Sequence, residues 1–241
     1  MLIVHEIPAA DDRVCEIRVG AGIATIESLL LPSVARVGVL TQPSVVALAQ
    51  RVAADARAAG YKADVLVLPD GDEAKTLSTM ESVFEWLNTL GLTRSDMLVG
   101  IGGGAVTDLA GFAAATYLRG IEVTYLATTL LGAVDAAIGG KTGVNVGGKN
   151  LAGVFRHPAR VIVDLDILRD LPESLLREGA AETVKAGFIA DPVIRDEYEA
   201  HGIEASLDVV VPAAIKVKVD TVKADFTEQG LRAILNYGHT I

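Results

Sequence analysis

The sequence predicts an α/β protein with a parallel sheet, followed by a helical region. Short apolar runs alternate with helical patterns from residue 36 to residue 127, which is typical of parallel strands with helices on both faces. One run, at residues 97–101, leads directly into three glycines and another helical pattern. Beyond residue 166 the pattern is helical throughout. We therefore predict a Rossmann-like domain over residues 1–166 and the start of an all-α domain over residues 167–241.

The individual elements follow from apolar periodicity and from the residues that begin and end helices. Residues 1–35 carry little pattern, whereas the later elements are clear. Pro43 opens and Gly60 closes the first clear helix, and Gly91 ends the second. Strands are expected at 14–19, 37–41, 63–68, 97–101, 123–127 and 161–164, and further helices at 23–31, 105–118, 173–189, 192–201 and 206–223.

Composition narrows the class of protein. With 241 residues, 51% of them hydrophobic, the chain can bury a sizeable core. Its net charge of −10 and isoelectric point near 4.9 argue against a nucleic-acid-binding surface. The single cysteine, Cys15, excludes an internal disulfide framework and favours a reducing compartment. No apolar run reaches the roughly 18 residues that span a bilayer. We expect a cytoplasmic protein with neither nucleic-acid nor membrane partners.

The stretch from Asp135 to Asn150 carries charged and amide side chains among closely spaced glycines. Glycine lets the backbone approach a ligand closely. Lys141 and Lys149, together with two amides, suit an anionic ligand that is rich in hydroxyls. A surface loop with solvated lysines is the alternative interpretation. The phosphate-loop pattern GxxxxGK[ST] is excluded, because its first glycine would fall on Asp135.

A second glycine-rich segment, Gly102–Gly104, joins a predicted strand to a helix N-terminus. Free N–H groups and the helix dipole favour a phosphate there. The segment does not fit GxGxxG, because Thr107 takes the third glycine position, and a tight turn without a ligand remains the alternative. Asp108 either bonds a ligand hydroxyl or simply occupies the first helical turn. Thr128 and Thr129 follow a strand at the edge where open α/β sheets bind ligands.

Glu182 and Lys185 lie three residues apart on one face of a predicted helix. An exposed ion pair is one interpretation. The small residues around Glu182 favour close helix packing instead, and a carboxylate there with His239 would supply two of the three protein ligands of a catalytic Zn²⁺. The spacing between Glu182 and His239 is too long to count as a motif.

Several motifs occur in order from about residue 36 to the end of the chain. They are Gly102-Gly-Gly-Ala-Val-Thr-Asp-Leu-Ala-Gly-Phe, Tyr117-Leu-Arg-Gly, Ala127-Thr-Thr-Leu-Leu, Val134-Asp, Gly139-Gly-Lys-Thr-Gly-Val-Asn, Ala181-Glu-Thr-Val-Lys and Leu235-Asn-Tyr-Gly-His-Thr. Together they resemble the 3-dehydroquinate synthase family of sugar-phosphate cyclases. The resemblance implies a lyase of the shikimate pathway of aromatic amino acid biosynthesis. Such an enzyme converts 3-deoxy-D-arabino-heptulosonate 7-phosphate into 3-dehydroquinate and phosphate.

The resemblance also implies cofactors and domain roles. NAD is used catalytically: a ring hydroxyl is oxidised, phosphate leaves and the ketone is reduced again. Zn²⁺ or Co²⁺ polarises the substrate oxygens. Residues 1–166 are then the NAD-binding domain, and residues 167–241 are part of a helical metal and substrate domain. A homodimer is expected.

The family's functional positions carry over onto residues of this sequence. The resemblance implies that Glu182 and His239 bind the metal, and that Arg119 contacts phosphate across a dimer interface. Cofactor contacts are implied for Asp72, Lys75, Gly103, Gly104, Asp108, Thr128, Thr129, Lys141, Lys149 and Asn150. Catalytic or substrate contacts are implied for Asp135, Lys141, Lys185, Lys218, Arg232 and Asn236.

This sequence departs from the family pattern in several places. Asp72 stands where the family has Glu, Phe226 stands where an acid is common, and the loop before Lys149 is one residue shorter. The chain ends at Ile241, directly after an amphipathic pattern, and carries no third metal histidine near its end. We therefore expect a truncated chain with reduced or no activity, because a catalytic zinc needs three protein ligands.

Three alternatives remain open at this stage. Another sugar-phosphate cyclase, of the 2-deoxy-scyllo-inosose or epi-valiolone type, would use the same chemistry on another sugar. A metal-dependent alcohol or glycerol dehydrogenase would accumulate NADH. A truncated module would bind NAD without catalysis.

Overall fold

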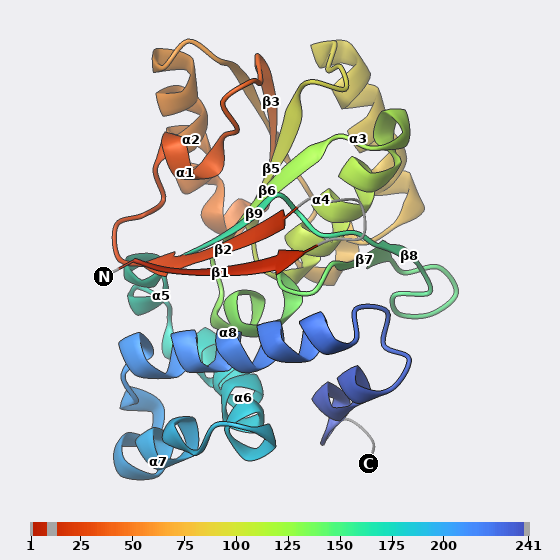
Figure 1. Cartoon of the computed structure of the whole chain (residues 1–241). Helices are drawn as coiled ribbons and strands as arrows, with labels where there is room; N and C mark the ends of the chain where they lie inside the picture. Colours follow the sequence, from red (N-terminus) through yellow and green to blue (C-terminus); the bar gives the residue numbers. More distant parts are fainter. Residues whose placement is uncertain (1, 9–13, 239–241) are drawn as a thin grey trace.

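The computed structural model describes residues 2–8 and 14–238 and is built on a seven-stranded sheet (Figure 1). The strand order is β1-β2-β9-β6-β5-β3-β4. All neighbouring strands are parallel except β1 and β2, which are antiparallel. The strands are β1 (Ile3–Pro8), β2 (Val14–Gly20), β3 (Arg36–Thr41), β4 (Lys62–Val67), β5 (Met97–Gly102), β6 (Glu122–Ala127) and β9 (Arg160–Asp164).

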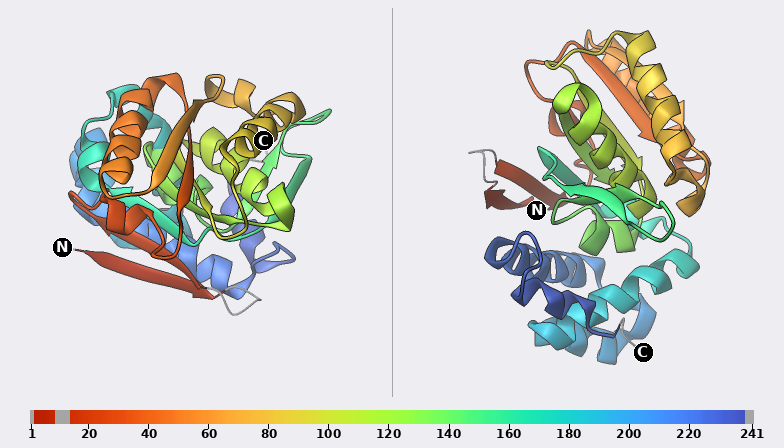
Figure 2. Two further views of the ribbon diagram at one scale, coloured as in Figure 1. Left: turned by 90° about the horizontal axis from the view of Figure 1, so that it is seen from above. Right: turned by 90° about the vertical axis from the view of Figure 1, so that its right-hand side faces the viewer.

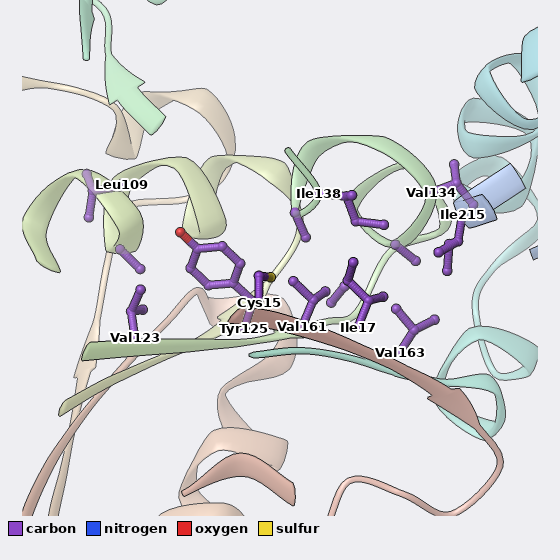
Figure 3. Close-up of a cluster of buried hydrophobic side chains, with 14 of the residues drawn as sticks. Cys15, Ile17, Leu109, Val123, Tyr125, Val134, Ile138, Val161, Val163 and Ile215 are labelled. Carbon is purple, nitrogen blue, oxygen red and sulfur yellow. The ribbon is translucent and has the colours of Figure 1, made fainter. Parts of the chain in front are cut away.

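Helices cover both faces of this sheet, as the alternation of strands and helices predicted. On one face, α1 (Ile26–Leu29) and α2 (Val46–Ala58) pack against strand residues such as Val39 and Val99. On the other face lie α3 (Leu77–Leu90) and α4 (Gly104–Thr116). Successive side chains of a strand point to opposite faces, so each strand contributes to both cores. Figure 3 shows Val123, Tyr125 and Val161 on the α4 side.

The helical region follows the last strand of the sheet. After α5 (Leu165–Arg169) come α6 (Glu173–Ile189), α7 (Pro192–His201) and α8 (Leu207–Ala224), and a 3₁₀ turn spans Leu231–Asn236. The limits predicted for α6 and α7 are confirmed to the residue. α8 packs against β1 and against the π-helical turn Gly132–Ala136, so the helices lie along one side of the sheet (Figure 2). The domain boundary near residue 166 stays a prediction. Within the described residues no helix is long and apolar enough to cross a membrane.

Two features of the sheet region were not predicted. Strand β1 pairs with β2 at the sheet edge, where one exposed strand face leaves a weak apolar signal. The predicted strands also did not include β7 (Lys141–Val144) and β8 (Ala152–Phe155), which form an antiparallel hairpin. The pairing depends on two facing glycines: a Cβ on Gly153 would lie 2.0 Å from the carbonyl oxygen of Thr142, and one on Gly143 would lie 2.5 Å from that of Ala152.

Candidate active site

A large cleft opens at the carboxyl ends of β3 and β5. The chain runs from β3 to β4 on one side and returns to β5 on the other, and ligands of open α/β sheets bind at such a switch point. The cleft measures about 1160 Å³, above the roughly 300–1,000 Å³ typical of small-molecule sites. Gln42 and Gly103 line it from the sheet, and Leu175 and Glu182 line it from α6.

The glycine segment after β5 presents the N-terminus of α4 to this cleft. A Cβ on Gly103 would lie 3.1 Å from Thr129, and one on Gly104 would lie 3.0 Å from the Cβ of Ala136. The segment is therefore packed against residues 129–136, with its backbone along the cleft wall. The first N–H groups of a helix have no intrahelical acceptor, so they are available to a phosphate. The predicted cofactor residues Thr128 and Thr129 line the same wall.

Lys75 organises the polar side of the cleft. It is only 2% exposed, and its Nζ donates to Asp108 Oδ2 at 2.6 Å and also to Asn150 Oδ1. Burial raises the pKa of the Asp108 carboxyl above its ordinary value, although the charge of Lys75 opposes the shift. Asp72, Lys149 and Asn150 line the cleft as well.

A smaller pocket of about 170 Å³ adjoins the cleft and shares Asp108, Asp135 and Asn150 with it. Its other polar lining consists of side chains predicted to contact the substrate, together with one acid that was not predicted. They are Lys141, Lys218, Arg232, Asn236 and Glu228. The structure therefore brings most of the predicted catalytic residues together beside the proposed cofactor residues.

Lys218 and Asp135 form an ion pair at the junction of the two cavities. Burial lowers the pKa of Lys218 below its ordinary value, against the attraction of Asp135. Burial by itself raises the pKa of Asp135, but the charge and hydrogen bond of Lys218 hold that pKa below its ordinary value. Asp135 is thus an anion, and it lines both cavities.

Glu228 is an acid of the smaller pocket that the sequence reasoning missed. It forms an ion pair with Lys141 and accepts a hydrogen bond from Asn236 Nδ2 at 3.0 Å. Burial raises the pKa of Glu228, but these two hydrogen bonds hold it below the ordinary value. Its backbone has φ +59°, a left-handed conformation that no local pattern indicated.

Arg232 is only 1% exposed, and its Nη1 donates to the carbonyl oxygen of Gly139 at 2.9 Å and to that of Phe226. These two acceptors are neutral, whereas the carboxylates of Glu228, Asp135 and Asp225 attract the guanidinium from nearby. A phosphate or carboxylate oxygen in the small pocket would compete with those carboxylates for Arg232.

Glu182 and Lys185 form an ion pair on α6, with side chains only 17% and 11% exposed. The interpretation as an exposed surface pair was therefore wrong. The predicted close packing is confirmed at Gly179, where a Cβ would lie 2.5 Å from Leu130. Among the described residues no group of three or more His, Cys, Asp or Glu side chains could hold a metal, and His239 lies outside them. The described residues therefore offer a carboxylate, Glu182, but no complete metal site.

Arg119 is the one predicted catalytic residue in the described ranges that the structure separates from the others. It ends the 3₁₀ turn Tyr117–Arg119 after the far end of α4, whereas the cleft lies at the N-terminus of that helix. Arg119 lines neither the cleft nor the smaller pocket. A single copy of this chain therefore does not bring Arg119 to the site.

Comparison with known proteins identifies the family. The model for the N-terminal part of 3-dehydroquinate synthase matches residues 65–178, and the model for its C-terminal part matches residues 179–241. The chain belongs to the 3-dehydroquinate synthase family. Over 231 residues it is 46% identical to the 3-dehydroquinate synthase of Mycobacterium leprae. This alignment covers 92% of the chain but only 64% of that relative, so the chain spans less than two thirds of the relative's length.

Solved structures of related cyclases have the same fold as this chain. One is a 2-deoxy-scyllo-inosose synthase complexed with carbaglucose-6-phosphate, NAD⁺ and Co²⁺, with a TM-score of 0.89 and 27% sequence identity. The match covers 98% of this chain and 68% of the synthase chain. A 2-epi-5-epi-valiolone synthase from Streptomyces hygroscopicus with bound NAD⁺ and Zn²⁺ has a TM-score of 0.84 and 27% identity, covering 92% and 65%.

Proposed function

We propose that this chain carries the cofactor cleft and much of the substrate pocket of a 3-dehydroquinate synthase, which converts 3-deoxy-D-arabino-heptulosonate 7-phosphate into 3-dehydroquinate and phosphate. The observation that carries the proposal is the junction, at Asp135 and Asn150, of a nucleotide-sized cleft with a smaller pocket that presents lysine and arginine side chains. A reaction that oxidises and re-reduces an anionic sugar needs this juxtaposition. The 46% identity to a curated synthase supports the choice among cyclases.

The cleft residues fit NAD. The N-terminus of α4 suits the pyrophosphate, and the Asp72 carboxylate suits a ribose hydroxyl at the rim of the cleft. When bound, the cofactor supplies transient oxidation of a ring hydroxyl and the later reduction of the ketone. Asp108 and Lys75 neutralise each other and so fix the cleft wall without adding net charge. The NAD-bound cyclase structures support this assignment.

The small pocket fits the anionic substrate. Lys141, Lys218 and Arg232 supply three cations. Asp135 and Glu228 pair with the two lysines, and the third acid of the lining, Asp108, is paired with Lys75. A phosphate or carboxylate oxygen would replace Glu228 or Asp135 as the partner of a lysine. Asp135, which is ionised and lies at the junction, would accept a proton from a substrate hydroxyl during oxidation, and Lys218 would return a proton.

We extend the proposal to a metal, Zn²⁺ or Co²⁺, as in the two solved cyclases. Glu182 and His239 are the proposed ligands. The described residues form no complete ligand set, so no step is assigned to the metal. We propose that two protein ligands hold it weakly and that turnover by these 241 residues is therefore reduced.

We also propose a cytoplasmic homodimer. Arg119 lies at the surface end of α4, away from the site in its own chain, and a second copy would bring it to the neighbouring substrate phosphate. The single cysteine, Cys15, is consistent with a reducing compartment. Sedimentation of the wild type and of Arg119→Ala would separate assembly from a phosphate contact: equal dimerisation with impaired phosphate release supports the contact, and an active monomer contradicts the dimer.

The deciding experiment is phosphate release from 3-deoxy-D-arabino-heptulosonate 7-phosphate with added NAD⁺ and Zn²⁺ or Co²⁺, while absorbance at 340 nm is followed. Phosphate release without net NADH is the expected result, and accumulating NADH would identify a dehydrogenase instead. If no phosphate is released, the assay is repeated with a chain extended past Ile241. Phosphate release by the extended chain then supports the synthase. Tight NAD⁺ binding without phosphate release supports a binding module.

A second candidate function is another sugar-phosphate cyclase, because the two solved structures with TM-scores of 0.89 and 0.84 are such enzymes. A hexose 6-phosphate in the same phosphate assay tests it. Release from the hexose phosphate but not from the heptulosonate would replace the first proposal.

A further inference from the structure

A network of hydrogen bonds joins the turn before α3 to the loop of the β7–β8 hairpin. The backbone N–H of Asn145 donates to the carbonyl oxygen of Lys75 (2.8 Å), and Asn145 Nδ2 donates to Asp72 Oδ2 (3.1 Å). Asn145 Oδ1 accepts from the backbone N–H of Asn150 (2.9 Å). Lys75 Nζ donates to Asn150 Oδ1 and closes a ring. Asn145 takes part in every one of these bonds except the last.

The ring needs an amide at position 145. The side chain donates to a carboxylate and accepts from a backbone N–H at the same time, and neither a carboxylate nor an apolar group can do both. The ring also holds Asn150 at φ +58°, a left-handed conformation that asparagine adopts more readily than most residues. Asn145 itself does not line the cleft, whereas Asp72, Lys149 and Asn150 do.

We propose that Asn145 is a positioning residue for the nucleotide cleft. By binding Asp72 and Asn150 together, it holds loop 145–151 against the turn that carries Asp72 and Lys75, and so places Lys149 and Asn150 over the cleft. This inference rests on the proposed function, because it concerns the same cofactor site. Asn145 acts through its neighbours and touches no ligand.

A cycle of variants tests the hydrogen bond between positions 72 and 145. Asn145→Asp keeps the acceptor for Asn150 but faces Asp72 with a like charge, and we expect it to weaken NAD⁺ binding about 10-fold at pH 7.5 by calorimetry. Adding Asp72→Asn to the same chain restores a donor, since the new amide at position 72 can donate to the new carboxylate at position 145. The effect of Asn145→Asp should then fall to less than about 2-fold when measured against Asp72→Asn alone, which cancels any direct contact of Asp72 with the cofactor.

A pH series adds a readout that a purely structural role would not move. Two facing carboxylates raise the pKa of one of them. As the pH falls from 7.5 to 5, the carboxylate introduced by Asn145→Asp should take up a proton, donate to Asp72 and regain most of the lost affinity. Val146→Asp is the matched control, because it adds the same charge at the next, 40% exposed position outside the ring. It should bind NAD⁺ like the wild type at both pH values.

The outcomes separate this inference from the proposed function. If the wild type binds NAD⁺ and Asn145→Asp binds it equally well, the positioning role is refuted while the cofactor site stands. If the defect is unchanged by Asp72→Asn or by pH, the ring is not the cause and the proposal also fails. If the wild type binds no NAD⁺, the proposed function fails. Hydrogen exchange then decides about the ring: faster exchange of residues 146–151 in Asn145→Asp supports it, and equal exchange overturns it.

Discussion

Replacement of Lys75 by methionine should destabilise the fold strongly, and by an amount that depends on pH. Lys75 is 2% exposed, and its Nζ lies 2.6 Å from Asp108 Oδ2. At this distance the attraction is about 6 kcal/mol for an effective dielectric constant near 20. Much of it offsets the cost of removing both charges from water, but loss of one partner leaves Asp108, whose side chain is only 18% exposed, without its cation. We expect Lys75→Met to lower the free energy of unfolding by about 3–5 kcal/mol at pH 7.5.

The pH dependence follows from Asp108. Burial already raises its pKa in the folded protein, and removal of Lys75 raises that pKa further. Below its folded pKa the carboxyl is protonated and can be buried at little cost. Asp108 has a lower pKa in the unfolded chain than in the folded protein. As the pH rises from the unfolded pKa to the folded pKa, the unfolded chain gives up the proton first, so the free energy of unfolding falls. The penalty of Lys75→Met should therefore be clearly smaller at pH 5 than at pH 7.5.

Urea denaturation at both pH values measures this effect. The double variant Lys75→Met/Asp108→Leu is the matched control, because it removes both charges and should recover most of the loss. A loss below about 1 kcal/mol, or a loss equal at the two pH values, would refute the reasoning that Asp108 becomes an unpaired buried charge.

Three further predictions concern other parts of the structure. Gly179→Ala places a Cβ 2.5 Å from Leu130, so thermal unfolding should show a loss of about 1–3 kcal/mol, and an unchanged melting temperature would contradict the close packing of α6. Asp96 accepts hydrogen bonds from Thr93, Arg36 and Ala35; burial raises its pKa, but these bonds hold it below its ordinary value. Its contribution is present above the unfolded pKa and is lost as the pH falls through the lower, folded pKa. Asp96→Ala should therefore cost most near pH 7 and progressively less in acid, as a pH series of urea titrations would show. Glu228→Gln removes the charge that pairs with Lys141, so phosphate or substrate should bind with altered salt dependence in calorimetry, whereas unchanged binding would exclude Lys141 from the anion site.

The sequence predicted the parallel part of the sheet and the helical region well, because these segments have strong periodicity and clear helix ends. Gly91, for example, has φ +64° and ends α3 as expected. The β1 strand and the β7–β8 hairpin were missed for a common reason. Neither gives a strong apolar alternation: β1 has one exposed face at the sheet edge, and Gly143 and Gly153 let the backbones of β7 and β8 meet closely without adding apolar side chains.

The candidate site was predictable mainly through motif resemblance. Spacing alone could not bring Lys75 to Asp108 or Lys218 to Asp135, because these contacts join residues 33 and 83 positions apart. Glu228 was missed because its role depends on Lys141, far away in the chain, and on a left-handed backbone. His239 lies outside the described residues, so its predicted role as a metal ligand stays a prediction.

The facing glycines of the β7–β8 hairpin have a consequence for variation within this family. Their backbones meet so closely that neither position tolerates a side chain. This contact fixes the register of the hairpin between Lys141 and the loop beyond it. Insertions or deletions in residues 145–151 can therefore alter the cofactor side of the molecule without shifting the lysine on the substrate side.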